Sequence, residues 1–136
     1  MKSVRGFAIV SAIFILVVLA ALGAFILNVS SSQQIGSALD VQGARAYQAA
    51  RAGIEWGLYR QLQAASCAAA ASFAPAAATL AGFTITVNCA ATADGSGGPT
   101  VYTLTSTACN QPDAGACPNT TNPGAFYVER RLTVTF

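Results

Sequence analysis

The sequence predicts an α+β fold in which one long N-terminal helix, from about residue 7 to residue 63, packs on a small antiparallel β-sheet. Two features predict the helix: an apolar run from Phe7 to Val29, and a proline-free continuation rich in Ala, Gln, Leu and Arg that ends near Gln63. The third feature is a change of pattern beyond Gln63, where short runs of alternating apolar residues are separated by clusters of proline, glycine and asparagine. Such runs are typical of strands joined by turns.

The apolar run has the length and flanking charge of a membrane helix. It can cross a hydrocarbon core of about 30 Å, Lys2 and Arg5 precede it, and no charged residue occurs from Gly6 to Leu39. A cleaved signal peptide, ending near the small residue Ala24, or a plain signal anchor would share these properties. Neither predicts a helix that continues to Gln63. We therefore expect a retained transmembrane helix at residues 7–29 and an exported domain at residues 30–136.

The second half of the predicted helix carries two sets of residues at helical spacing. One is a face of small residues that allows close approach of a partner surface: Gly36, Gly43, Ala46, Ala50, Gly53 and Gly57. The other is a stripe of larger residues that we expect to face the core: Ile35, Leu39, Ile54, Leu58 and Leu62. Trp56 and Tyr59 are predicted to pack at the edge of that stripe.

Three later runs predict the strands of the sheet. They are residues 83–89, 100–107 and 126–136, each with β-branched or aromatic residues. The Ala-rich stretch after Gln63, which contains Pro75, is predicted to be a loop or a short frayed helix. Residues 93–99 predict a hairpin turn, and residues 110–124 a longer loop.

All four cysteines lie beyond the apolar run, in the part that is exported if the positive residues stay inside. Two disulfides are therefore predicted, and four cysteines permit three pairings. We favour the sequence-adjacent pairs, Cys67 with Cys89 and Cys109 with Cys117. A zinc site is disfavoured because the spacing lacks the Cys-x-x-Cys pairs of zinc ribbons.

The composition argues against an enzyme, a metal or cofactor site, and a nucleic-acid partner. The chain has no histidine, and its five acidic residues are scattered. Once Lys2 and Arg5 are set aside, the remaining basic and acidic residues balance, which leaves no basic patch. Asp94 and Asp113 supply one carboxylate per loop, far short of a calcium site. If the chain binds a ligand, the 110–124 loop is where we expect it.

The N-terminal residues resemble those of type IV pilins and type II secretion pseudopilins, and among these the minor pilins of the MSHA type. The resemblance is carried by a short basic leader ending in Gly6 and followed by Phe7, and by three segments, residues 6–14, 47–57 and 128–131. It implies that residues 1–6 are a leader, that a prepilin peptidase cuts after Gly6, and that the new N-terminus, Phe7, is methylated. It also implies a single-pass protein of the bacterial inner membrane that later enters a surface pilus. Its partners would be other major and minor pilins, the peptidase, the inner-membrane assembly machinery and, before assembly, lipid.

One position departs from the pattern of the major pilins. Most of them carry a glutamate at the fifth residue of the mature chain, where this sequence has Ser11. A carboxylate buried in a membrane needs a compensating charge, so its absence removes a pairing that shaft subunits use. The resemblance therefore points to a minor subunit acting in assembly, priming or at the tip. A minor pseudopilin of type II secretion, and a tip adhesin that uses the 110–124 loop, stay open as alternatives.

Overall fold

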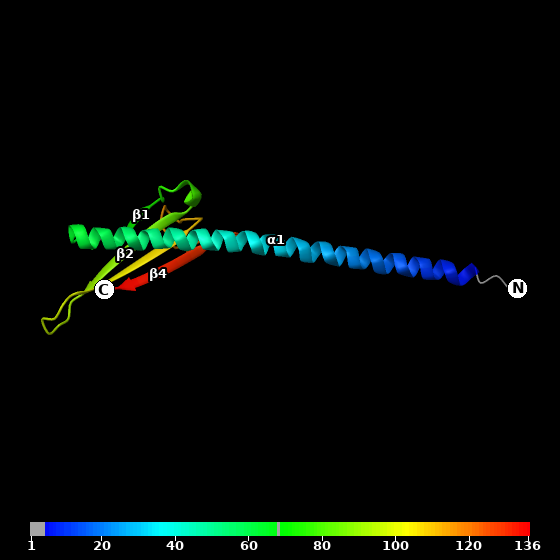
Figure 1. Cartoon of the computed structure of the whole chain (residues 1–136), viewed down its shortest axis with the longest axis horizontal. Helices are drawn as coiled ribbons and strands as arrows, with labels where there is room; N and C mark the ends of the chain where they lie inside the picture. Colours follow the sequence, from blue (N-terminus) through cyan, green and yellow to red (C-terminus); the bar gives the residue numbers. More distant parts are fainter. Residues whose placement is uncertain (1–4, 68) are drawn as a thin grey trace. The chain divides into compact units, whose positions relative to one another are not determined.

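The computed structural model describes residues 5–67 and 69–136, with side chains from residue 8 onward, and shows an α+β fold (Figure 1). Helix α1 spans Arg5–Ala64, and a four-stranded antiparallel sheet follows it. The predicted fold class and the extent of the helix are confirmed. The chain divides into two compact units, up to Ala38 and Leu39–Phe136, and each is described by itself.

In the second unit the strands follow one another in the order β1-β2-β3-β4. Strand β1 is Ala71–Phe73, β2 is Thr84–Thr92, β3 is Val101–Cys109 and β4 is Glu129–Thr135. Three of these match the predicted runs with shifted ends. The hairpin between β2 and β3 is closed by a hydrogen bond from the Gly97 amide to the Asp94 carbonyl, 3.1 Å, and Gly97 adopts a φ of +83° that favours glycine.

The prediction for the Ala-rich stretch after Gln63 was wrong in part: the short 3₁₀ helix at Ala78–Leu80 agrees with it, but strand β1 was not predicted. Ala71 and Phe73 pair with Val87 and Ile85 of β2. Between them, the hydroxyl groups of Ser72 and Thr86 are hydrogen-bonded at 2.9 Å. Since alanine has little intrinsic β-propensity, this strand depends on its pairing with β2, a tertiary contact that local composition does not report.

The small-residue face of α1 packs directly against the sheet. Ala46, Ala49 and Ala50 are fully buried with Ile85, Val87 and Leu104. A methyl group added at Gly57 would lie 3.1 Å from Leu104 Cδ2 and Val87 Cγ1. Helix and sheet therefore approach as closely as alanine and glycine permit, and the sheet supplies the bulk of the core. Gly36 is the exception to the predicted face, because apart from its own helical neighbours no atom of the described residues lies within 4 Å of where its Cβ would be.

The predicted stripe of larger residues was wrong in part. Leu39, Ile54 and Leu58 are half-buried at the margin of the core, but Ile35 is 48% exposed and Leu62 is 70% exposed. The reason is that the small residues occupy the face toward the sheet, so that the larger ones fall on its flanks.

The prediction that Trp56 and Tyr59 pack at the edge of the stripe was also correct only in part. Trp56 packs on Phe73 of β1 with ring centroids 4.9 Å apart, and the guanidinium of Arg60 lies 5.3 Å from the Trp56 ring. Tyr59, in contrast, is exposed.

Candidate functional site

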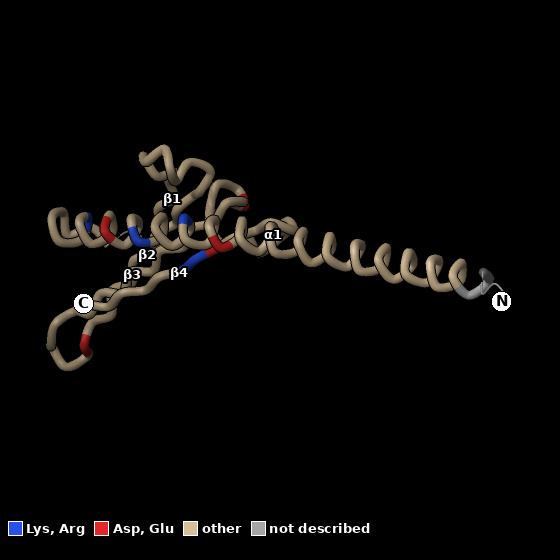
Figure 2. The backbone as a smooth tube through the Cα atoms, turned by 45° about the vertical axis from the view of Figure 1, so that its right-hand side comes forward, with Lys and Arg blue, Asp and Glu red and all other residues tan. Residues whose placement is uncertain are grey.

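The N-terminal half of α1 is an apolar surface with no covering partner within the described residues. Its large side chains are exposed along the whole segment, Phe14 to 68% and Leu27 to 72%. No charge occurs between Ala8 and Leu39 (Figure 2). Large apolar side chains in water are unfavourable by about 25 cal/mol per Å² of exposed area. The helix is long enough and apolar enough to span a membrane.

The predicted processing residues lie at the start of this helix or just outside the described part. Arg5, Gly6 and Phe7 belong to the first turns of α1, while Lys2 lies outside the described residues. Ser11 lies in the next turns, half-buried, within the uncharged stretch. A carboxylate at this position would therefore lie in apolar surroundings, where ionisation is costly without a partner.

The two disulfides are Cys67–Cys89 and Cys109–Cys117, the pairing favoured by sequence adjacency. Because side chains alternate along a strand, they lie on opposite faces of the sheet. Cys89 shares the helix-facing side with Val87, and Cys109 shares the opposite side with Thr107. The first disulfide connects the segment that follows α1 to β2, and the second ties the long loop before β4 to the end of β3.

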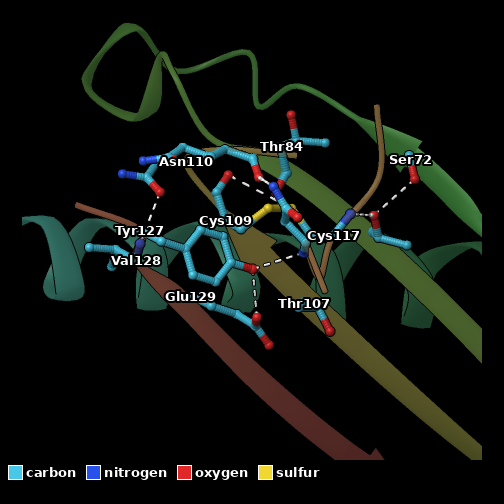
Figure 3. Close-up of a disulfide and its surroundings, with 12 residues drawn as sticks. Ser72, Thr84, Thr107, Cys109, Asn110, Cys117, Tyr127, Val128 and Glu129 are labelled. Carbon is cyan, nitrogen blue, oxygen red and sulfur yellow. Dashed lines mark hydrogen bonds between the residues drawn. A yellow bond between two sulfur atoms is a disulfide. The ribbon is translucent and has the colours of Figure 1, made fainter. Parts of the chain in front are cut away.

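The loop between β3 and β4 is held against the outer face of the sheet, the face opposite α1, near the end of β3 (Figure 3). The Cys117 amide donates to Thr86 Oγ1 at 2.8 Å, which explains why Thr86, on the outer face, is buried. Asn110 bridges both ends of the loop, because its Nδ2 donates to the Phe126 carbonyl at 2.8 Å and its Oδ1 accepts from the Val128 amide at 2.9 Å. These bonds give the loop a defined shape.

Tyr127 connects this loop to β4. Its hydroxyl donates to Glu129 Oε2 at 2.6 Å and accepts from the Asn119 amide at 3.0 Å (Figure 3). Burial raises the pKa of the Tyr127 phenol, and the hydrogen bond to Glu129 raises it further. Both effects favour the neutral phenol, since ionisation would bring two negative charges together.

The rest of the loop is closed by polar contacts among its own side chains. Asp113 accepts a hydrogen bond from Thr121, and Asn119 Oδ1 accepts from the Thr121 amide at 3.1 Å. Gln111 Oε1 accepts from the Gly124 amide at 2.9 Å. The polar atoms in this part of the 110–124 segment thus serve to hold its conformation.

Sequence reasoning missed the row of threonines on the outer sheet face. Thr105 and Thr133 are cross-strand neighbours with hydroxyls 3.3 Å apart, and Thr103 and Thr135 are 3.4 Å apart. The signal was present as threonine at every second position of residues 103–107 and 133–135. Its meaning depended on the register between β3 and β4, which the sequence leaves open.

Comparison with protein-family models, with curated proteins and with solved structures finds no match for this chain. The architecture itself is pilin-like: a long apolar N-terminal helix continues into a second half that packs on a disulfide-bonded antiparallel sheet. The two disulfides indicate an extracytoplasmic location for the sheet, because such bonds persist in oxidising compartments.

Proposed function

We propose that this chain is a minor pilin-like subunit of a type IV pilus of the MSHA type, acting in pilus assembly, priming or at the tip. The observation that carries the proposal is that the two halves of α1 differ in their surfaces and in their packing. Its first half exposes an uncharged apolar surface, and its second half is fixed to the sheet through alanine and glycine. Helix α1 can therefore anchor the folded domain in a membrane and later attach it to a bundle of helices.

The apolar half of the helix explains retention in the membrane before assembly. Each buried Leu, Ile or Phe contributes about 1.5–3 kcal/mol, and the exposed segment includes many such residues between Ile9 and Val29. Transfer of this helix into water is therefore negligible. Entry into a filament replaces lipid contacts by contacts with other pilin helices, and small residues such as Ala20, Ala21 and Gly23 permit close approach.

Ser11 supports a minor role rather than that of a bulk shaft subunit. A buried glutamate needs a counter-charge from a neighbour, whereas serine enters an apolar bundle at far lower cost. A subunit with Ser11 is suited to a position where no such neighbour is in place. The partners in this proposal are other pilins, prepilin peptidase and the inner-membrane assembly machinery.

The proposal is tested by mass spectrometry of the mature N-terminus, in membrane fractions from cells with and without prepilin peptidase. We expect a chain that begins at methylated Phe7 only when the peptidase is present. Gly6→Val should block this cleavage, and the matched variant Gly23→Val should leave it intact. A mature N-terminus near Ala24, sensitive to Gly23→Val, would contradict the proposal and identify a secretory signal peptide.

Localisation separates the pilus from the secretion alternative. An epitope-tagged chain should co-purify with sheared surface pili and be lost from that fraction in the Gly6→Val variant. Tagged protein confined to the envelope of cells that carry normal pili, together with a defect in protein secretion, would favour a minor pseudopilin.

A further inference from the structure

Strand β4 forms one edge of the sheet and, within the part of the chain that the structure describes, is paired only with β3 (Figure 1). Tyr102 and Phe136 exchange both backbone hydrogen bonds, at 2.9 and 3.0 Å. In an antiparallel pair such bonded positions recur at every second residue. Val134, Leu132 and Arg130 therefore also direct their backbone groups toward β3.

The intervening residues direct their backbone groups outward. The amide and carbonyl groups of Arg131, Thr133 and Thr135 have no hydrogen-bond partner among residues 5–67 and 69–136. The Glu129 carbonyl differs, because it accepts a bond from Arg130 Nη1 at 3.0 Å. Three consecutive outward positions thus present paired donors and acceptors at the spacing that an added strand requires.

This edge carries charged residues at its start but, among the described residues, lacks other devices that block strand addition. Strand β4 is seven residues long, contains no proline, and keeps an unbroken register with β3 from Glu129 to Thr135. The opposite edge, β1, is three residues long and is followed closely by Pro75. Short strands and proline are common means of protecting an edge. The β1 edge has both of these features, and the β4 edge has neither.

The side chains of β4 define the chemistry of a partner strand. On the outer face, Thr133 and Thr135 continue the row of hydroxyls that begins on β3, and a threonine or serine opposite them would extend it. On the helix-facing side, Leu132 and Val134 are only half-buried, so apolar residues opposite them would gain burial.

The charge at this edge is positive. Arg130 and Arg131 are both exposed, against one acidic residue, Glu129. Glu129 already accepts a hydrogen bond from the Tyr127 hydroxyl, and its Oε1 lies 3.6 Å from Arg131 Nη2. Arg131 Nε donates to Thr107 Oγ1 at 3.3 Å, which holds its guanidinium on the outer face. A carboxylate across from Arg131 would complement it.

We propose that the β4 edge binds an extended polypeptide segment of a partner protein as an additional antiparallel strand. The segment carries hydroxyl side chains opposite Thr133 and Thr135, apolar side chains opposite Leu132 and Val134, and a carboxylate opposite Arg131. This surface lies in the unit Leu39–Phe136. The inference does not require the pilus assignment, and its failure would leave that assignment intact.

The test uses a synthetic peptide, Thr-Val-Thr-Val-Glu, blocked at both ends, and the full-length ¹⁵N-labelled protein in detergent micelles. Amide hydrogen exchange is measured by NMR with increasing peptide. At saturation we expect the amides of Arg131, Thr133 and Thr135 to exchange about tenfold more slowly. The amides of Leu132 and Val134, which already bond to β3, should change little.

Two matched variants separate backbone pairing from side-chain effects. Thr133→Pro removes an outward amide without removing a bond to β3 and should abolish the protection. Thr133→Val retains the amide and should keep it. If circular dichroism shows that Thr133→Pro does not fold, Thr135→Pro makes the same test near the end of the strand.

The proposal is overturned if the folded wild-type protein shows no saturable protection, or if the proline variants are protected as well as the wild type. Replacement of Glu by Lys in the peptide should weaken binding at least threefold at low salt. Equal binding of the two peptides would overturn the assignment of an acidic partner.

Discussion

Among the glycines of α1, Gly53 is the one at which an added Cβ would lie closest to atoms of the sheet, and it is the sharpest place to test the packing. A Cβ added there would overlap Ser106 Oγ and lie 2.6 Å from Ile85 Cγ2 and 3.1 Å from Val87 Cγ2. Ile85 and Ser106 are both fully buried and belong to the central strands. Both side chains are enclosed by the core, so accommodating the added methyl group requires them to repack or the helix to shift, and Gly53→Ala should destabilise the domain.

The size of the effect follows from two opposing terms. Overpacking a well-packed core costs about 1–3 kcal/mol, and the overlap with two fully buried side chains places this site near the top of that range. Replacing glycine by alanine in a helix contributes about 1 kcal/mol in the other direction. The expected net loss is about 2 kcal/mol. For a small domain this lowers Tm by roughly 8–16 °C.

The assay is thermal and urea unfolding of the full-length protein in detergent, followed by far-ultraviolet circular dichroism and Trp56 fluorescence. Gly36→Ala is the matched control, because in the described part of the chain the added methyl group would meet only its own helical neighbours within 4 Å. It should be neutral or stabilising by up to about 1 kcal/mol. Gly57→Ala meets Leu104 and Val87 side chains at 3.1 Å and should fall between the two.

Ser106 supplies an independent check on the same contact. Its buried hydroxyl has no hydrogen-bond partner within the described structure, so Ser106→Ala should be neutral or slightly stabilising. In the Gly53→Ala background it removes one of the overlapping atoms and should restore about 1 kcal/mol. If Gly53→Ala is as stable as the wild type, or if Ser106→Ala gives no rescue, the close approach of helix and sheet is refuted.

The remaining predictions concern the β3–β4 loop and the apolar half of α1. Replacing Cys109 and Cys117 together by serine should cost about 2–3 kcal/mol in urea unfolding, the entropy of an open loop of this size; a cost below about 0.5 kcal/mol would contradict it. The folded-state pKa of Tyr127 is raised above its usual value of 10.0, so its contribution to stability is fully present below pH 10 and is lost as pH rises through the folded value. Tyr127→Phe should therefore reduce the loss of stability above pH 10. The difference between the ultraviolet titration curves of the wild type and the variant gives the pKa of the Tyr127 phenol, and an ordinary pKa would contradict this prediction. On the proposed pilus assignment, Ser11→Glu should change the number or length of pili, with Ser11→Gln as the uncharged control, because a carboxylate buried in a membrane or an apolar bundle needs a partner charge; unchanged pili would show that Ser11 does not set the role.

The extent to which the fold was predictable differs between its elements. The helix from Arg5 to Ala64 was predictable because periodicity, the absence of proline and helix propensity all agree over a long segment. Strands β2, β3 and β4 were predictable for similar reasons, with ends displaced by one to three residues at most. Strand β1 was not, since alanine and serine acquire a strand conformation there only through β2.

For the two sets of residues on the helix, side-chain packing was likewise only partly predictable from the sequence. Spacing placed Gly53 and Gly57 on one face and Leu58 and Leu62 on a neighbouring face. Spacing alone does not decide which face meets the sheet. The usual preference for large residues in a core favoured the stripe of larger residues, of which Leu39, Ile54 and Leu58 reach only the margin of the core, while Ile35 and Leu62 are exposed. The sheet already fills the core with Ile85, Val87 and Leu104, and the helix fits only where it carries no bulk.

The sequence by itself determined an uncharged apolar helix at the N-terminus, its unbroken continuation and the α+β class, and it favoured the sequence-adjacent disulfides without excluding the other pairings. These depend on local composition and on short separations along the chain. Only the tertiary structure decided that glycine and alanine form the contact face, that the threonines of β3 and β4 stand side by side, and that β4 is left with an open edge. Each of these depends on register and strand order, which are set by contacts between residues far apart in sequence.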